Sequence, residues 1–411
     1  MPRNSEALTS VTSDRWLLPE VRHGEAADDP LDFLALDTLL SSEEKSVRAR
    51  TRKFIADELE PHISEWFQGR VPIRELGREF GRRGFFGSLI GSSNDTPPAV
   101  SFGLSMLEFE AADTGLRQFI STQDNLVMFA LARYGSPEQR CEWLPRLRTG
   151  EAIGCFGMTE PQAGSDASGI RTFATRDGND WVLNGRKRWI TNAVDADVAI
   201  IWAQTEEGLR GFVVPTATKG FSAVDIAGKV SMRHSSSADL RLEDVRLPHT
   251  ALMPLTKGVS APLSCTNEAR YGILWGAVGA ARSSYEAALR RARERQQFGK
   301  PLAAFQMTQQ RLVEMCSKVN RAGLLALHLG RLREAGRATA AQLSLGKLEN
   351  VRIGLEVARE ARAMHGGDGV TLGYPAIRHA SNLEAVSTYE GTHEMHTLAI
   401  GKALTGVSAF R

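Results

Sequence analysis

The segment Ser387-Thr388-Tyr389-Glu390-Gly391-Thr392-His393-Glu394, near the end of the chain, separates two helical patterns. We expect a helix to end at Tyr389 and the backbone to turn at Gly391, because glycine adopts turn conformations at little steric cost. Thr392 then caps a new helix, whose apolar residues recur at helical spacing. Glu390 would stand at the mouth of a gap between helices. A desolvated carboxylate there has a raised pKa and can act as a base, and the alternative is an exposed glutamate at a helix end.

The composition is that of an ordinary soluble globular protein, with 42% hydrophobic and 24% charged residues. A length of 411 residues exceeds what one simple core accommodates, so we expect two or three packed domains. A net charge of +2 implies no binding to nucleic acid or to a membrane surface.

No apolar run approaches transmembrane length. Residues 1–29 contain several acidic residues and no apolar centre, so we expect a mobile tail rather than a signal or transit peptide, and a cytoplasmic protein. The four cysteines are too widely spaced for a zinc site or a disulfide framework, and we expect buried, reduced thiols. His393 and His396 lack the His-Glu-x-x-His spacing and a third ligand, so we expect no metal site.

Hydrophobic periodicity divides the rest of the chain into three domains, at residues 30–153, 154–261 and 262–411. The first contains helical patterns only, and Ser41 marks one helix start, with acidic residues in the first turn. The last contains long helices that would form a bundle. Its expected helices cover residues 267–295, 305–334, 340–365, 376–389 and 392–405.

The middle domain contains short strand-like runs, at residues 198–204, 211–215, 222–226 and 239–242. Asn184-Gly185, flanked by apolar residues on both sides, has the sequence of a two-residue hairpin turn. We therefore expect an antiparallel barrel or sandwich. No Gly-x-Gly-x-x-Gly follows a strand, so a dinucleotide would not be held in the Rossmann manner. The predicted fold is mainly α with a central β-domain.

Five motifs occur in order along the chain: Phe156-Gly157-Met158-Thr159-Glu160-Pro161 with Gly164-Ser165-Asp166, Asn184-Gly185 leading to Trp189-Ile190-Thr191-Asn192, residues 295–302 with Gln306, Gly366-Gly367-Asp368-Gly369, and Tyr389-Glu390-Gly391-Thr392. Together they resemble the acyl-CoA dehydrogenase family over nearly all of the chain after the first thirty residues. Residues 154–157, 268–273 and 377–386 resemble most closely the glutaryl-CoA dehydrogenase branch. The resemblance implies an N-terminal helical domain, an antiparallel β-barrel or sandwich, and a C-terminal four-helix bundle.

The resemblance implies that a proton alpha to a thioester and a hydride on the beta carbon are removed together. No amino acid accepts a hydride, so this chemistry requires a flavin, here FAD. Glu390 is the implied base, opposite the flavin ring with the acyl chain between them. Its backbone N–H and a flavin hydroxyl would hold the thioester oxygen and stabilise the developing enolate.

The resemblance also implies two groups of FAD contacts. Those around the flavin ring and its phosphates are Phe156, Met158, Thr159, Ser165, Trp189 and Thr191. The alternative for Trp189 is an ordinary aromatic on the face of a sheet. Those around the adenosine half, or reaching the FAD of a neighbouring subunit, are Arg295, Phe298, Gln306, Gly366, Gly367, Thr392 and Glu394. A guanidinium suits pyrophosphate because it pairs with it through two hydrogen bonds.

In the glutaryl branch the acyl pocket ends in an arginine that pairs with the distal carboxylate of the substrate. Arg117, Glu110 and Ser121 match that arginine, a nearby acid and a serine. The alternative for Arg117 is an exposed cation at a helix end. Gln118 departs from the small serine usual at its position and adds both a donor and an acceptor. The remaining implied substrate contacts are Ser165, Asn267, Arg270 and Tyr389.

The implied function is FAD-dependent α,β-dehydrogenation of a short acyl thioester, glutaryl-CoA, with decarboxylation to crotonyl-CoA. Gln118 leaves open another short-chain or dicarboxylyl thioester, on coenzyme A or on a carrier protein. An acyl-CoA oxidase or flavin monooxygenase on the same fold, and a non-enzymatic scaffold, are further alternatives. Glu390 argues against the monooxygenase, and the flavin motifs argue against the scaffold. The implied partners are an electron-transfer flavoprotein and further copies of the chain in a homotetramer.

Overall fold

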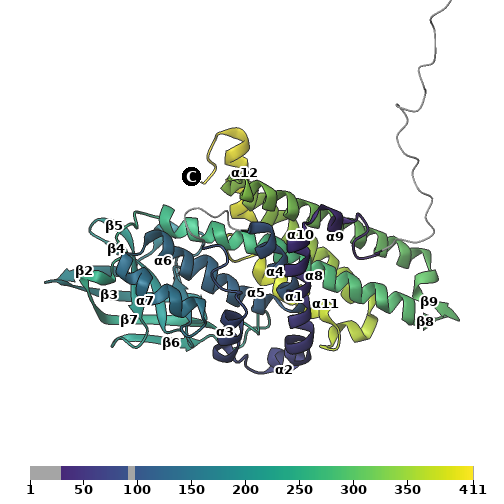
Figure 1. Cartoon of the computed structure of the whole chain (residues 1–411), viewed down its shortest axis with the longest axis horizontal. Helices are drawn as coiled ribbons and strands as arrows, with labels where there is room; N and C mark the ends of the chain where they lie inside the picture. The colour runs from purple at the N-terminus through teal and green to yellow at the C-terminus, as the bar shows by residue number, and fades with distance from the viewer. Residues whose placement is uncertain (1–28, 91–97, 411) are drawn as a thin grey trace, which may run out of the picture.

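The structure, a computed structural model, describes residues 29–90 and 98–410. Helices form both ends of the chain, and the strands of one large sheet lie between them in the sequence. In space the sheet occupies one end of the molecule, and long helices run from it to the opposite end (Figure 1). The predicted fold class is confirmed. The expected N-terminal tail, except for its last residue, lies outside the described residues.

The N-terminal helices begin where local sequence signals place them. Ser41 Oγ accepts a hydrogen bond from Glu44 N at 3.2 Å, and the Glu44 carboxylate accepts one from Ser41 N at 2.7 Å, which is a capping box. Asp113 caps a second helix by accepting from Gly115 N at 2.7 Å. The helices of this region are α1 (Ser42–Phe54), α2 (Ile63–Gln68), α3 (Ile73–Arg82), α4 (Ala99–Ala112), α5 (Thr114–Ser121), α6 (Phe129–Tyr134) and α7 (Pro137–Arg148), with π-helical turns at Ile55–Leu59 and Thr122–Met128.

The strands of the sheet are β1 (Gly154–Gly157), β2 (Phe173–Asp177), β3 (Asp180–Thr191), β4 (Val198–Thr205), β5 (Gly208–Pro215), β6 (Phe221–Asp225) and β7 (Ser237–Pro248). Their order is β1-β4-β2-β3-β7-β6, and β5 also pairs with β4. The long pairings are antiparallel, as expected, whereas β1 lies parallel to β4. Along β4, Ala199 and Ile201 join an apolar cluster of the sheet itself, and Ile200 and Trp202 pack with the helices. The sheet is thus buried on both faces at β4, and its helix-facing side supports the site described below.

The Asn184-Gly185 pair is not a hairpin turn, contrary to the prediction. β3 continues through it and pairs with β7 on both sides, with a bulge between Leu183 and Gly185. The turn that joins β2 to β3 lies at Gly178-Asn179, where Gly178 has a φ of 61°. A Cβ added at Gly185 would lie 2.4 Å from Thr172 Oγ1, so a close backbone approach explains this glycine.

The C-terminal region is built on α8 (Ser260–Glu294), which packs against α4, α9, α10 and α11. Small residues allow α8 to approach α4 closely: a Cβ added at Gly279 would lie 1.9 Å from Leu107 O. The other elements are the hairpin β8 (Gln296–Gln297) and β9 (Lys300–Pro301), then α9 (Gln306–Glu334), α10 (Ala340–Met364), α11 (Pro375–Val386) and α12 (His393–Thr405). The predicted long helices are all present, which supports the predicted bundle.

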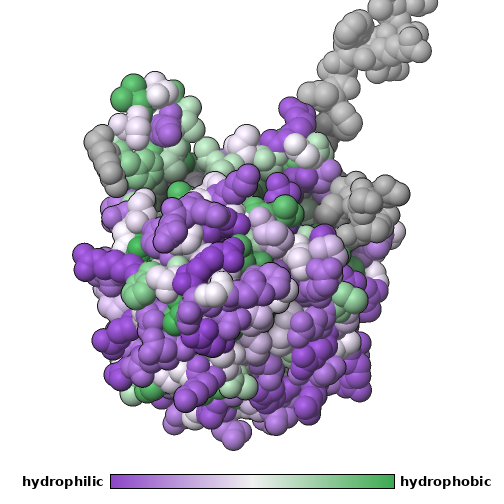
Figure 2. Space-filling model, turned by 90° about the vertical axis from the view of Figure 1, so that its left-hand side faces the viewer, coloured by the Kyte–Doolittle hydropathy of each residue, from purple (hydrophilic) through white to green (hydrophobic). Residues whose placement is uncertain are grey.

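The surface at the sheet end is mainly hydrophilic, with small apolar patches (Figure 2). No helix within residues 29–90 and 98–410 is long and apolar enough to cross a membrane. The prediction for the cysteines is right for Cys155 and Cys265, which are buried, and wrong for Cys141, which is exposed. Cys316 is partly exposed.

Candidate active site

The loop between α11 and α12 holds Glu390 in a left-handed backbone conformation. α11 ends at Val386, slightly earlier than predicted, and φ is 55° at Glu390 and 93° at Gly391. A side chain with a Cβ rarely adopts this region, at a cost of about 1–2 kcal/mol. Thr392 Oγ1 accepts a hydrogen bond from Met395 N at 3.3 Å, so the predicted cap of α12 is confirmed. Contacts from neighbouring helices must therefore hold the strained turn.

A buried lysine and a half-buried arginine hold three consecutive carbonyl groups of this loop. Lys347 Nζ, from α10, donates to Tyr389 O and, at 2.6 Å, to Gly391 O. Arg270 Nε, from α8, donates to Glu390 O at 2.9 Å. Arg270 is itself oriented by Asn267, whose Oδ1 accepts from Arg270 Nη1 at 2.6 Å. The expected substrate residues Asn267 and Arg270 thus shape the backbone around Glu390.

The Glu390 carboxyl group is placed as a base requires. Its Oε2 has no contact with solvent and no hydrogen-bond partner in the part of the chain that the structure describes. Burial raises the pKa of Glu390, and the positive charges of Arg270 and Lys347 offset this only in part. Burial also lowers the pKa of Lys347 to about 7, although Glu390 opposes that shift. A carboxylate that has a buried, unpartnered oxygen and a raised pKa is suited to removing a weakly acidic proton.

Arg117, in α5, lies beside this loop and is fully buried. Its Nη2 donates to Tyr389 Oη at 2.7 Å, and its Nε donates to Glu110 Oε2 at 2.6 Å. Its Nη1 donates to Gln118 Oε1 at 2.8 Å. The alternative of an exposed cation at a helix end is wrong. The structure therefore brings Arg117 and Glu110 together and connects them through Tyr389 to Glu390.

The Arg117–Glu110 pair packs closely against α8. A Cβ added at Gly276 would lie 2.0 Å from Glu110 Oε2, so this glycine makes room for the pair. Burial lowers the pKa of Arg117, but the opposing effects of Glu110 and Tyr389 are larger and raise it, so the guanidinium stays charged. Ser121, one helical turn after Arg117, is buried, and its Oγ has no partner among the described residues. An unpartnered buried hydroxyl next to a buried cation suits an anionic group of a ligand.

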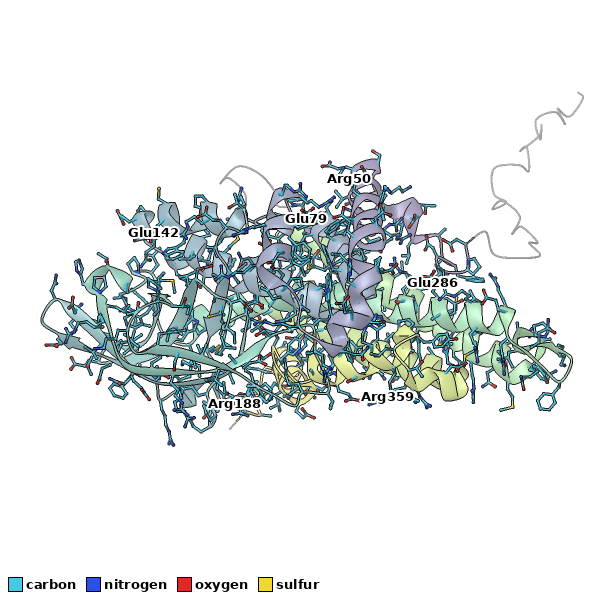
Figure 3. The ribbon with its side chains drawn as sticks, turned by 90° about the horizontal axis from the view of Figure 1, so that it is seen from below. Arg50, Glu79, Glu142, Arg188, Glu286 and Arg359 are labelled. Atoms are coloured by element: carbon cyan, nitrogen blue, oxygen red, sulfur yellow. The ribbon has the colours of Figure 1, made fainter. Side chains whose placement is uncertain are left out.

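The residues expected around the flavin ring gather at the helix-facing side of the sheet. Arg188 N donates to Thr159 O at 2.9 Å, which joins the segment after β1 to the end of β3. Trp189 has a φ of 63° and is 52% exposed, with Arg188 over its ring. Figure 3 shows Arg188 where the sheet meets the C-terminal helices. Phe156 differs, because its ring is buried in the core against Trp202.

These residues fit a flavin. Ser165 is exposed and Thr159 and Thr191 are half-buried, so their hydroxyl groups are open to a ligand. An exposed indole next to such hydroxyls suits a flat, largely apolar ring with polar edges. Glu390 supplies a carboxyl group whose Oε2 has no partner among the described residues.

Most of the residues expected around the adenosine half of FAD lie far from the flavin-ring residues. Arg295, Phe298 and Gln306 are at the β8–β9 end of the molecule, opposite the large sheet (Figure 1). Phe298 is 92% exposed, and the guanidinium of Arg295 makes no ion pair within residues 29–90 and 98–410. The glycine run lies near the same end of α8, since Asp368 pairs with Arg291 at 2.7 Å. One chain does not bring these residues to its own flavin-ring group. Thr392 and Glu394 stand at the start of α12, beside Glu390.

Sequence reasoning missed Lys347. Its signal was a lysine on the buried face of α10, at helical spacing from Leu343, Asn350 and Val351. It also missed a buried cluster in which Arg378 Nε and Asn382 Nδ2 of α11 donate to Asp113 Oδ2, at 2.9 Å and 3.0 Å. That cluster ties α11 to α5, so it fixes the position of the Glu390 loop relative to Arg117.

Family models match three consecutive parts of the chain. They describe the N-terminal, middle and C-terminal domains of acyl-CoA dehydrogenases and match residues 41–151, 155–245 and 256–405. The chain therefore belongs to the acyl-CoA dehydrogenase family.

Individual relatives agree with this family. The chain is 32% identical to a probable acyl-CoA dehydrogenase of Bacillus subtilis, over 89% of this chain and 98% of that protein. It is also 32% identical to the mitochondrial long-chain specific acyl-CoA dehydrogenase of Sus scrofa, over 89% and 87% of the two chains. Among solved structures, a glutaryl-CoA dehydrogenase from Mycobacterium smegmatis in complex with FADH2 is 51% identical, covers 93% of this chain and 99% of its own, and has a TM-score of 0.91.

Proposed function

We propose that this protein is an FAD-dependent dehydrogenase of a short acyl thioester, with glutaryl-CoA as the first candidate substrate. The observation on which the proposal rests is the connection of two groups, a half-buried carboxyl group whose Oε2 has no partner among the described residues and a fully buried cation. Glu390 presents an unpartnered carboxylate, and Arg117, joined to it through Tyr389, presents a buried cation. The 51% identity to a protein named as a glutaryl-CoA dehydrogenase, solved with FADH2, supports the same substrate and cofactor.

In this proposal Glu390 Oε2 takes the proton from the carbon alpha to the thioester. FAD, when bound, supplies the acceptor for the hydride of the beta carbon. The residues that would hold its ring are Met158, Thr159, Ser165, Trp189 and Thr191, with the backbone of Phe156 behind them. The Glu390 N–H would donate to the thioester oxygen, where negative charge develops as the proton leaves.

Arg117 would select a substrate with a distal carboxylate. The carboxylate would take over hydrogen bonds that Arg117 now makes to Gln118 and Tyr389, and Ser121 Oγ would add a donor. Oxidation makes this carboxylate vinylogous to the thioester carbonyl, so carbon dioxide can leave with the bonding electrons remaining as a dienolate. Glu390, now protonated, would return its proton to give crotonyl-CoA.

We further propose a homotetramer in which one chain completes the FAD site of another. The opposite placement of Arg295, Phe298, Gln306, Gly366 and Gly367 supports this, because these residues are far from the flavin-ring group of their own chain. Thr392 and Glu394 would lie near the adenine half. An electron-transfer flavoprotein is the proposed electron acceptor, in the cytoplasm.

One observation supports a second candidate substrate. Gln118 Oε1 already accepts from Arg117, and Gln118 Nε2 donates to Thr122 Oγ1 at 3.3 Å. The guanidinium is thus satisfied without a substrate anion. An acyl thioester with a shorter or uncharged end, on coenzyme A or a carrier protein, is the alternative.

The test is anaerobic bleaching of the bound flavin with a panel of acyl-CoAs. We expect glutaryl-CoA to reduce the flavin fastest, with release of carbon dioxide and formation of crotonyl-CoA. Equal rates with butyryl-CoA would favour the second candidate. Hydrogen peroxide formed in stoichiometric amounts under air would instead indicate an oxidase.

A further inference from the structure

The Glu390 loop has a feature that its role as a base does not require. Its three consecutive carbonyl groups, at positions 389, 390 and 391, each accept a hydrogen bond from a cationic side chain, Lys347 or the half-buried Arg270. Lys347 accounts for two of the three and is fully buried. A lysine is strongly solvated in water, so burying it solely to fill space would be costly.

The hydrogen bond from Lys347 to Tyr389 O determines the orientation of one peptide group. In a trans peptide the C=O and the following N–H point in opposite directions. With Tyr389 O directed at Lys347, the Glu390 N–H is directed away from it. Among the described residues no acceptor binds this N–H, although it lies outside any helix. A donor next to the base therefore remains free.

We infer that Lys347 is a positioning residue of the proposed reaction. By donating hydrogen bonds to Tyr389 O and Gly391 O, it orients the Glu390 N–H toward the thioester oxygen of the substrate and polarises it. The inference rests on the proposed function. A hydrogen bond or positive charge at the carbonyl end of a peptide makes its N–H a better donor. Enolate charge would be stabilised through the backbone, and Lys347 need not touch the substrate.

The second hydrogen bond explains why a single side chain is used. Gly391 O lies on the other side of Glu390, so one Nζ fixes both ends of the strained turn. Both the ammonium and the neutral amine of Lys347 can donate two hydrogen bonds, so this pair of hydrogen bonds requires no particular protonation state.

The test uses the holoenzyme and acetoacetyl-CoA, a thioester whose enolate is visible by ultraviolet absorbance. Its beta carbon is a carbonyl carbon and carries no hydride, so the enzyme cannot dehydrogenate it. We expect the wild-type protein to lower the pKa of the bound ligand. Lys347→Met, which keeps the length and removes the donors, should shift that pKa upward by about one unit, a roughly tenfold loss of enolate, which is smaller than the loss of a whole oxyanion donor.

Lys229→Met is the matched control. Lys229 also donates to backbone carbonyls, those of Met232 and Ser235, but in the segment between β6 and β7, which contacts α11 and makes no hydrogen bond to residues 389–391. It should leave the pKa of bound acetoacetyl-CoA unchanged. An unchanged pKa in Lys347→Met, or equal shifts in both variants, would overturn the inference.

A second measurement on the wild-type protein covers the case in which Lys347→Met does not fold. Acetoacetyl-CoA, but not coenzyme A alone, should slow hydrogen exchange of the Glu390 amide. No protection of this amide would overturn the inference. If acyl-CoAs bleach the flavin while the wild type leaves the pKa of acetoacetyl-CoA unshifted, the role of Lys347 fails and the proposed function stands.

Discussion

Replacing Arg117 with methionine removes the cation from the end of the proposed acyl pocket and keeps most of the buried volume. A distal carboxylate placed there would lose its charged partner in a site closed to solvent. Truncating one member of a buried, hydrogen-bonded charge pair typically costs about 2–5 kcal/mol. The kcat/KM for glutaryl-CoA should therefore fall by about 30-fold or more. Butyryl-CoA has no distal carboxylate and should be affected far less.

The same substitution also affects folding, so it needs a control. Glu110 and Arg117 are both fully buried and 2.6 Å apart, and removing either leaves an uncompensated charge. We expect the free energy of unfolding to fall by about 3–5 kcal/mol. Glu110→Gln breaks the same pair but keeps the cation. Both variants should unfold at lower urea concentration, and only Arg117→Met should change the preference for glutaryl-CoA over butyryl-CoA.

The assay is steady-state turnover of both thioesters with an artificial electron acceptor, by wild type and both variants. Equal losses on the two substrates in Arg117→Met would mean that Arg117 is structural. Together with a wild-type enzyme that uses butyryl-CoA as well as glutaryl-CoA, this result would refute the dicarboxylate proposal. The protein would then be a general short-chain dehydrogenase.

Four further predictions concern the base, its pH dependence, the cofactor and the core. Glu390→Gln should bind acyl-CoA without reducing its flavin, and wild-type reduction in stopped-flow experiments would remove Glu390 from the mechanism. In the wild type the reduction rate should rise with pH, with a midpoint above the ordinary glutamate pKa of 4.5, because burial raises the pKa of Glu390 and only the carboxylate accepts a proton. Arg295→Ala should retain less FAD after gel filtration, since a charged hydrogen bond is worth roughly 1.5–3 kcal/mol, and full occupancy would argue against a phosphate contact. Burial alone would raise the pKa of Glu108, but Arg282 and Arg52 lower it to about 2. The Glu108 carboxylate therefore stabilises the folded state fully above pH 4.5, and this stabilisation is lost as the pH falls toward 2. Glu108→Gln should flatten the pH dependence of the free energy of unfolding in urea between pH 4.5 and 2. An unchanged profile would show that the pairing of Glu108 with Arg282 and Arg52 contributes nothing to stability.

Sequence periodicity was sufficient to predict the helices, because the residues on the buried face of a helix recur at helical spacing in the sequence. α9 and α10 lie within one residue of their predicted bounds, whereas α8 begins seven residues before its predicted start. Caps were equally readable, since Ser41 and Thr392 act on backbone groups only a few residues away. The hairpin was misplaced because Asn-Gly suits a turn in isolation, whereas the approach of residue 172 to β3 is a tertiary contact.

The placement of Glu390 at a helix break, and its chemical type, were determined by the sequence itself, because the signals are local. That its Oε2 is buried without a partner among the described residues depends on the helices packed around the loop, and only the tertiary structure decided it. The same is true of Arg117, which in sequence is equally compatible with an exposed cation. Its burial with Glu110 depends on the space that Gly276 leaves on a helix more than 150 positions later in the chain. Lys347, 43 positions before Glu390, reaches the loop only after α10 has packed. Groups so distant in sequence interact through geometry that no local pattern encodes.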